Sequence, residues 1–167
     1  MKSLTKTLIS ILVLGSTISY SASFEQNGVK EGNNRVSIGL YTTIPDEGDE
    51  STTFYGTYGY FYNDNVELSL ATTITASGGD TFYWLKPGAN YYFLKNPTLT
   101  PYIGASIYYF DSSVDNTDAD YGSEYHIGAH KFFTEDMAIT GEAGSSFYEF
   151  DEYLQSYINI YLTYFFN

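Results

Sequence analysis

The chain has 167 residues, a formal net charge of −13, no cysteine and an unusually high number of aromatic residues, with 19 Tyr and 12 Phe. This length allows for one domain, and the lack of cysteine excludes disulfides and thiolate metal sites. The acidic balance excludes nucleic acid as a partner, because an acidic surface repels the phosphate backbone.

The first residues have the layout of a secretory signal peptide. Lys2 and Lys6 precede the apolar run Leu8–Leu14, and small residues follow it. The run is too short to span a bilayer as a helix, which takes about 20 residues. We therefore expect residues 1–22 to be removed on export and residues 23–167 to form the mature domain; a retained membrane anchor is the alternative.

After this leader, eight segments alternate between polar and apolar residues, which is the period of a strand with two different faces. They span residues 34–43, 52–62, 66–75, 82–93, 99–110, 122–133, 137–147 and 153–166. Their lengths of about 10 to 14 residues are closer to the roughly 9–11 of a tilted membrane-spanning strand than to the 5–6 usual in soluble proteins. Pro87 interrupts the fourth segment, and with Gly88 it predicts a bulge.

Short and long connections alternate along the chain. Three are tight, at residues 63–65, 94–98 and 134–136. Four are longer and more acidic, at residues 44–51, 76–81, 111–121 and 148–152. Short turns at one end and long loops at the other are typical of outer-membrane barrels, whose short turns face the periplasm.

Within most segments one face is apolar and the other mixes charge, hydroxyl groups and glycine; the faces of 137–147 are the least clear. Only five basic residues follow the leader, whereas a soluble barrel would carry dense charge outside. We therefore predict that the apolar faces meet lipid and the polar faces fill the lumen. The barrel must close, because an open edge in hydrocarbon leaves backbone groups unsatisfied. A soluble periplasmic barrel is the alternative. In the last strand the lipid-facing residues would be Ile158, Ile160, Leu162, Tyr164 and Phe166.

Three stretches, "KPGANYYF" followed by "TPYIGASIYYF" and then "GEAGSSFYEF", together with the aromatic last strand, resemble the small eight-stranded outer-membrane β-barrels, the superfamily of OmpA transmembrane domains and OmpX-like proteins. The likeness spans about residues 33–167. It implies an all-β, eight-stranded antiparallel up-and-down transmembrane barrel in a Gram-negative outer membrane, placed among lipopolysaccharide by the barrel-assembly machinery. That machinery reads a terminal Phe in such proteins, whereas here Phe166 is penultimate and Asn167 is last.

If the alternation holds, seven ionisable side chains face the lumen. They are Arg35, Glu67, Lys86, Glu124, His126, His130 and Glu142. Side chains fill the interior of an eight-stranded barrel, and buried charges must pair. We expect a polar network that stiffens the barrel; a gate on a narrow proton or ion path is the alternative. No cofactor is expected.

Two features bear on catalysis and metal binding. His126 and His130 lie about 13–14 Å apart on a strand, too far for one metal ion to bridge them. Some eight-stranded barrels trim lipid A with a membrane-facing His, Ser and acid, but His126 is followed by Ile127 and Gly128 and is predicted to point inward. The sequence therefore favours a protein that is not an enzyme.

The four longer loops hold 12 acidic residues and no basic one. Asp115, Asp118 and Asp120 are candidates for weak binding of Ca²⁺ or Mg²⁺, since these cations prefer carboxylate oxygen. Solubilising charge beside lipopolysaccharide is the alternative. We predict a non-enzymatic outer-membrane barrel that contributes to envelope integrity or surface interaction. A small-solute or ion channel, a ligand-binding barrel and a lipid-A-modifying enzyme are the other possibilities.

Overall fold

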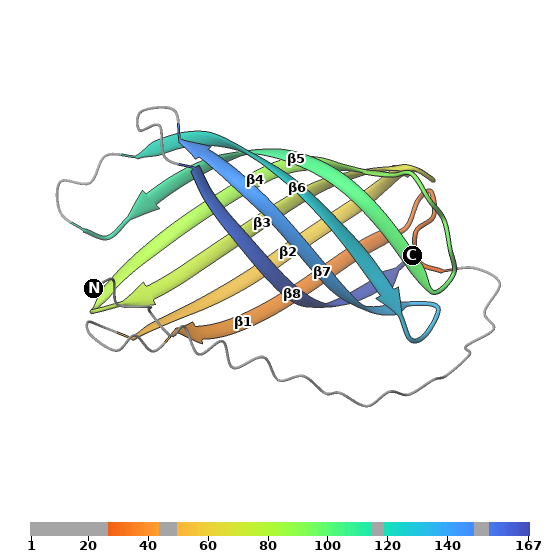
Figure 1. Cartoon of the computed structure of the whole chain (residues 1–167), viewed down its shortest axis with the longest axis horizontal. Helices are drawn as coiled ribbons and strands as arrows, with labels where there is room; N and C mark the ends of the chain where they lie inside the picture. Colours follow the sequence, from red (N-terminus) through yellow and green to blue (C-terminus); the bar gives the residue numbers. More distant parts are fainter. Residues whose placement is uncertain (1–26, 44–49, 115–118, 149–153) are drawn as a thin grey trace, which may run out of the picture.

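The structure, a computed structural model, describes residues 27–43, 50–114, 119–148 and 154–167. Within them, eight antiparallel strands form a closed barrel in which each strand pairs with its neighbours in sequence and the last returns to the first (Figure 1). The strands are β1 (Asn34–Thr43), β2 (Ser51–Asn63), β3 (Val66–Ser77), β4 (Asp80–Tyr92), β5 (Leu99–Ser112), β6 (Asp120–Phe132), β7 (Met137–Tyr148) and β8 (Leu154–Phe166). The predicted all-β up-and-down barrel is confirmed. The leader predicted at residues 1–22 lies outside the described residues, and none of the described residues forms a helix long and apolar enough to cross a membrane.

Every predicted strand boundary lies within two residues of the observed one. The connections differ more. The connections at one end of the barrel, here called the turn end, have two, six and four residues, and those at the other, the loop end, have seven, two, seven and five (Figure 1). The connection expected to be tight at 94–98 is thus a six-residue one, 93–98. The longer loop expected at 76–81 is instead a two-residue turn, Gly78–Gly79. Both glycines have positive φ, 59° and 94°, a conformation that matches the twist of the two strands and favours glycine.

The bulge expected at Pro87 is absent, and a different one is present. The β3–β4 register runs without a shift through Leu70↔Pro87, while the β4–β5 pairs skip positions 86 and 87. Proline has no N–H to donate, so it fits where the ladder bond is missing. The register shift lies between Phe61 and Asn63 of β2 instead.

The outer surface of the barrel is apolar. Aliphatic residues form its middle band, and aromatic residues lie nearer both ends, as in membrane barrels. Exposed aliphatic residues include Ile38, Leu68, Leu70, Leu85, Ile103, Ile127, Ile139, Ile158, Ile160 and Leu162. Exposed aromatic residues include Tyr60, Tyr62, Tyr91, Phe93 and Tyr164 toward the turn end, and Phe54, Tyr83, Tyr121 and Phe147 toward the loop end.

Strand β7, whose faces were unclear from sequence, alternates as regularly as the others. Ile139 and Phe147 are exposed, whereas Ala138, Thr140 and Ser146 are buried. Its large outward-facing residues, Met137, Ile139 and Phe147, all have odd numbers, and the small residues on both faces had obscured this regular pattern. Consequently Glu142 lies on the lumen side.

The turn end of the barrel is closed by a layer we call the turn-end seal. Its members come from β2, β4, β5, β6, β7, β8 and the segment before β1: Val29, Phe61, Tyr92, Tyr102, Phe132, Ala138 and Phe165, all buried. Residues 27–33 are held across this end by hydrogen bonds. Asn27 Nδ2 donates to the Thr100 hydroxyl (2.8 Å), and the Gly32 N–H donates to the Phe61 carbonyl (2.9 Å). Gly28 leaves no room for a side chain, because a Cβ there would lie 2.2 Å from Phe165 Cβ.

Candidate functional site

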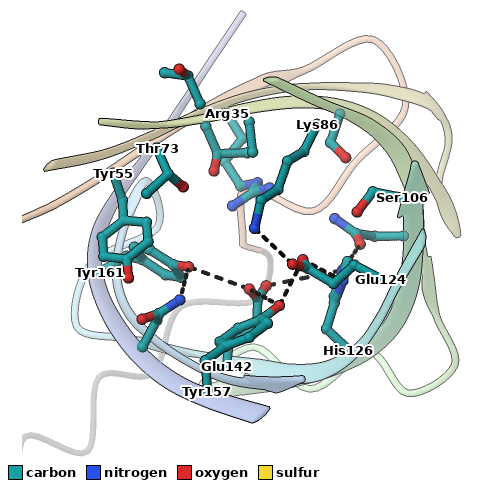
Figure 2. A pocket seen from close by; sticks show the side chains of 16 residues that line it. Arg35, Tyr55, Thr73, Lys86, Ser106, Glu124, His126, Glu142, Tyr157 and Tyr161 are labelled. Atoms are coloured by element: carbon teal, nitrogen blue, oxygen red, sulfur yellow. Dashed lines mark hydrogen bonds and ion pairs between the residues drawn. The ribbon is translucent and has the colours of Figure 1, made fainter. Parts of the chain in front are cut away.

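The structure places all seven ionisable residues predicted for the lumen inside the barrel. β1 supplies Arg35, β3 Glu67, β4 Lys86 and β7 Glu142, while β6 supplies Glu124, His126 and His130. Figure 2 shows Lys86 reaching toward Glu124, with Tyr157 and Glu142 beside them. Four of the seven residues form two ion pairs, Arg35–Glu67 and Lys86–Glu124, which lie at different depths in the lumen. Hydroxyl groups surround each pair.

The deeper ion pair joins Arg35 to Glu67. Arg35 Nε lies 2.7 Å from Glu67 Oε1, and the other carboxylate oxygen accepts hydrogen bonds from Asn90 Nδ2 (3.0 Å) and the Tyr92 hydroxyl (2.5 Å). Glu67 is fully buried, so its charge is compensated wholly by these contacts. Gly59 makes the approach feasible, because a Cβ there would lie 1.5 Å from Glu67 Oε1.

From this ion pair a closed circuit of hydrogen bonds, here called the polar ring, runs around the inside of the barrel. Its successive contacts are 2.5 to 3.0 Å long and all its members are buried. In order, the ring passes through Arg35, Ser37, Thr163, Thr140, His130, Tyr92 and Glu67, and returns to Arg35.

The direction of every hydrogen bond in the polar ring follows from its charged members. An ionised Glu67 can only accept, so the Tyr92 hydroxyl donates its one hydrogen bond to Glu67 and accepts a hydrogen bond from the His130 Nε2–H. The other ring nitrogen, Nδ1, then accepts from the Thr140 hydroxyl. At the other end of this series Arg35, which can only donate, donates to the Ser37 hydroxyl. Ser37 then donates to Thr163, and Thr163 donates to Thr140. A neutral His130 with its proton on Nε2 therefore satisfies every member of the ring.

The shallower network centres on Glu124. Its Oε2 lies 2.7 Å from Lys86 Nζ and accepts from the Ser146 hydroxyl at 3.0 Å, while Oε1 accepts from the Tyr157 hydroxyl at 2.8 Å. The Lys86 ammonium also lies 5.6 Å from the centre of the Tyr157 ring. These contacts join β4, β6, β7 and β8 across the lumen.

Glu142 and His126 occupy the space between the two ion pairs. Glu142 Oε2 accepts from the Tyr102 hydroxyl (2.7 Å). His126 Nε2 lies 2.7 Å from Asn90 Oδ1, while its buried Nδ1 has no hydrogen-bond partner among the described residues. That nitrogen is 3.8 Å from Glu124 Oε1. The described lumen holds the three carboxylates of Glu67, Glu124 and Glu142 against one Arg and one Lys.

Two adjoining cavities remain in the lumen. The deeper one, lined by Arg35, His126 and Glu142 among others (Figure 2), measures about 40 Å³, which leaves room for about one water. The second, about 260 Å³, lies toward the loop end. Lys86 and Tyr157 line both cavities. Side chains therefore interrupt the path from the loop end to the turn-end seal.

The candidates for metal binding and catalysis lie in different parts of the chain. No group of three or more His, Asp or Glu side chains able to hold a metal ion occurs in the described part of the chain. Asp115 and Asp118 lie outside that part, and Asp120 Oδ1 accepts the N–H of Tyr121 at 2.7 Å. His126 points into the lumen, away from the lipid-facing surface where a lipid-A-trimming site would lie.

The sequence reasoning missed the tyrosines and asparagine that complete these networks. Asn90, Tyr92, Tyr102, Tyr157 and Tyr161 all bond to lumen carboxylates or to their partners. One signal could have found them, since each shares the parity of the inward-facing residues of its strand.

No family model matches the chain, and no curated protein matches it. Solved structures do match. The N-terminal β-barrel domain of Pseudomonas aeruginosa OprF aligns at 17% identity with a TM-score of 0.64, covering 81% of this chain and 98% of that one. OprG of the same organism aligns at 15% identity (TM-score 0.55, 82% and 97% coverage). Ail, the attachment invasion locus protein of Yersinia pestis, aligns at 17% identity (TM-score 0.52, 81% and 99% coverage). This chain therefore has the fold of the small eight-stranded outer-membrane barrels.

Proposed function

We propose that this chain is a non-enzymatic β-barrel protein of the bacterial outer membrane that contributes to envelope integrity or to surface interaction. One observation carries the proposal. The barrel exposes its aliphatic side chains around the outside and buries its ion pairs inside. Soluble monomers rarely expose contiguous apolar patches beyond about 300–600 Å², whereas a membrane barrel requires such a band.

A structural role is supported over transport by the filling of the lumen. The turn-end seal and the two ion-pair networks fill the lumen beneath the larger cavity, and the deeper cavity measures only about 40 Å³. Opening a path would break at least the Lys86–Glu124 pair. A narrow ion or solute channel is the second candidate, favoured by the adjoining cavities that share Lys86 and Tyr157.

Fractionation and heat-modifiable gel migration test the location and the fold together. We expect the protein in the outer-membrane fraction, with unboiled samples in dodecyl sulfate migrating differently from boiled ones because a closed barrel resists the detergent. A folded protein recovered from the soluble periplasm without detergent would overturn the proposal.

Planar-bilayer recording separates the structural role from the channel. We expect no discrete conductance from the refolded protein. Steady unitary currents that the variant Glu124→Gln alters would favour the channel instead. Mass analysis of lipid A from cells with and without the protein tests the enzyme alternative, and an unchanged lipid A is expected.

Lipopolysaccharide and divalent cations are the partners we propose at the loop end, with the barrel-assembly machinery during insertion. The support for the first two is the acidic character of the loops, including Asp80, Asp111 and Asp120 of the described residues. Mg²⁺ or Ca²⁺ would bridge these carboxylates to lipid phosphates. Magnesium-dependent retention of lipopolysaccharide by the purified protein, lost on chelation, is the expected result.

A further inference from the structure

We propose that the larger cavity, the loop-end cup, binds a small uncharged polyhydroxylated molecule of the size of one sugar ring. The cup measures about 260 Å³, which corresponds to about nine water molecules. It is smaller than the roughly 300–1,000 Å³ of drug-sized ligand sites, so only a small ligand fits. The proposal rests on the proposed function in one respect: a location in the outer membrane determines from which side of the membrane the ligand reaches the cup.

Hydroxyl groups dominate the lining of the cup. Of the eleven described residues that line it, eight carry a hydroxyl group, and they come from β2, β3, β5, β7 and β8. Hydroxyls both donate and accept, so such a wall suits a ligand that does the same around its edge. Thr53 and Thr75 already bond to each other at 2.9 Å, which holds one side of the wall in place.

The charges of the lining residues disfavour a charged ligand in the cup. Among the described residues that line the cup, Lys86 is the one with a charge, and the Lys86 ammonium is already paired with Glu124 at 2.7 Å. An anion would compete with Glu124 for Lys86, and a cation would find no carboxylate among the lining residues. Because burying an unpaired charge is costly, an uncharged ligand is favoured over an acid or an amine of the same size.

One wall of the cup is aromatic. Trp84 lines it, and the indole is supported by Phe110 and Phe82, whose ring centres lie 4.9 and 6.4 Å away. An indole offers a large rigid apolar surface together with an N–H donor. A sugar ring presents the complementary pair of surfaces, a C–H face and a hydroxyl edge. The aromatic wall therefore distinguishes a ring-shaped polyol from a linear one.

The cup is blind. Its floor is made by Lys86 and Tyr157, which also line the small cavity beneath, and the turn-end seal lies deeper still. A ligand can therefore enter and leave only from the loop end. This geometry describes a binding site rather than a passage.

The single tryptophan of the chain makes the proposal directly testable, because Trp84 alone supplies the indole emission. Folded full-length mature protein in detergent micelles would be titrated with methyl glycosides of glucose, galactose and mannose. We expect a saturable change in emission with at least one of them, with a dissociation constant of about 1–10 mM. Gluconate and glucosamine serve as the anionic and cationic probes, and should bind at least about tenfold more weakly.

Two matched variants locate the site, with unchanged heat-modifiable migration as the folding control. Thr73 lines both the cup and the deeper cavity, so Thr73→Val removes one hydroxyl from the cup at nearly constant shape and should weaken binding about tenfold. Thr57→Val makes the same change beside the deeper cavity alone and should leave binding unaltered. Adding an oligosaccharide released from lipopolysaccharide distinguishes a lipid-borne sugar from a free one, and displacement by it identifies the lipid-borne source.

Absence of a saturable response to every neutral glycoside up to about 100 mM would overturn the proposal, as would equal binding of the charged probes or equal effects of the two variants. A protein that fractionates with the outer membrane and folds, yet shows one of these results, would refute the sugar site and leave the proposed function standing.

Discussion

Glu67 is the residue on which the deep part of the lumen depends. Its two oxygens accept from Arg35, Asn90 and Tyr92, and Gly59 provides the space in which the carboxylate lies. Removing one member of a buried ion pair costs about 3–5 kcal/mol, because the other charge stays buried without compensation. The effect of a substitution at Glu67 on stability therefore depends on whether the Arg35 charge is still present.

We expect Glu67→Gln to lower the free energy of unfolding by about 3–5 kcal/mol, measured by urea unfolding in micelles with Trp84 emission as the signal. Lys95→Met breaks the exposed pair with Asp64 (3.2 Å) and should cost no more than about 1 kcal/mol. The double variant Arg35→Met/Glu67→Met should be more stable than Glu67→Gln alone. Equal losses from Glu67→Gln and Lys95→Met would show that the buried pair is not specially important.

Among the strands, the seam between β1 and β8 is the shortest ladder. It has five paired positions, from Asn34↔Phe166 to Ile38↔Leu162, whereas the β2–β3 ladder has twelve. The polar ring crosses this seam through the Ser37 and Thr163 hydroxyls, which lie 2.8 Å apart. Side-chain hydrogen bonds thus reinforce the closure where backbone pairing is least extensive.

A disulfide tests this closure, because the chain has no cysteine of its own. Ser37→Cys/Thr163→Cys puts two thiols on directly paired positions, within the spacing that a disulfide requires. We expect oxidation to lock the barrel, seen as a gel mobility that resists boiling until reductant is added. Ser37→Cys/Thr53→Cys should stay reduced, because Thr53 pairs with Tyr41 and lies four residues from Thr57, the partner of Ser37 on β2; cross-linking of that control to the same extent would argue against the register.

The turn-end connections are tied together by Asp64. Its Oδ1 accepts the Glu31 N–H at 3.0 Å, and its Oδ2 lies 3.2 Å from Lys95 Nζ. The Glu31 N–H, followed by Lys95, lowers the pKa of Asp64 below its usual 3.8. A lowered folded-state pKa means that this carboxylate stabilises the fold above its usual pKa, and that the contribution is lost as pH falls through the folded-state value.

Asp64→Asn should therefore lower stability above about pH 4 by no more than about 1 kcal/mol, because the site is exposed. Below the folded-state pKa the variant and the original protein should converge. Urea unfolding midpoints followed from pH 7 to the acid limit check this. A difference that persists unchanged at the lowest pH would show that the carboxylate charge is not its source.

The sequence predicts those elements whose residues alternate regularly between polar and apolar, and does not predict the irregular ones. Alternation predicted all eight strands, because each has one face toward a different surrounding. It could not predict the Gly78–Gly79 turn, the shift beside Tyr62 or the segment 27–33, which have no period. Nor could it pair Lys86 with Glu124, because partners across the lumen depend on how the closed sheet staggers its strands.

At the scale of the whole molecule, polarity is inverted relative to a soluble protein, and β6 offers a matched test. Ile127 in the middle of the strand and Tyr121 near its loop end lie on the same outer face with exposures of 57% and 56%. In a bilayer Ile127→Lys should cost about 2–4 kcal/mol and Tyr121→Lys about 0–1, measured by equilibrium folding into phospholipid vesicles. In water both substitutions would be nearly neutral, so equal small effects in vesicles would contradict membrane insertion.

The contact between Gly28 and Phe165 has a consequence for how the molecule is made. The turn-end seal joins Val29, from the segment ahead of the first strand, to Phe165, near the end of the last one, with five residues of the strands between them. Two parts of the chain that are 137 positions apart, Gly28 and Phe165, therefore meet at this end. The end of the barrel is complete only once the last strand has paired with the first.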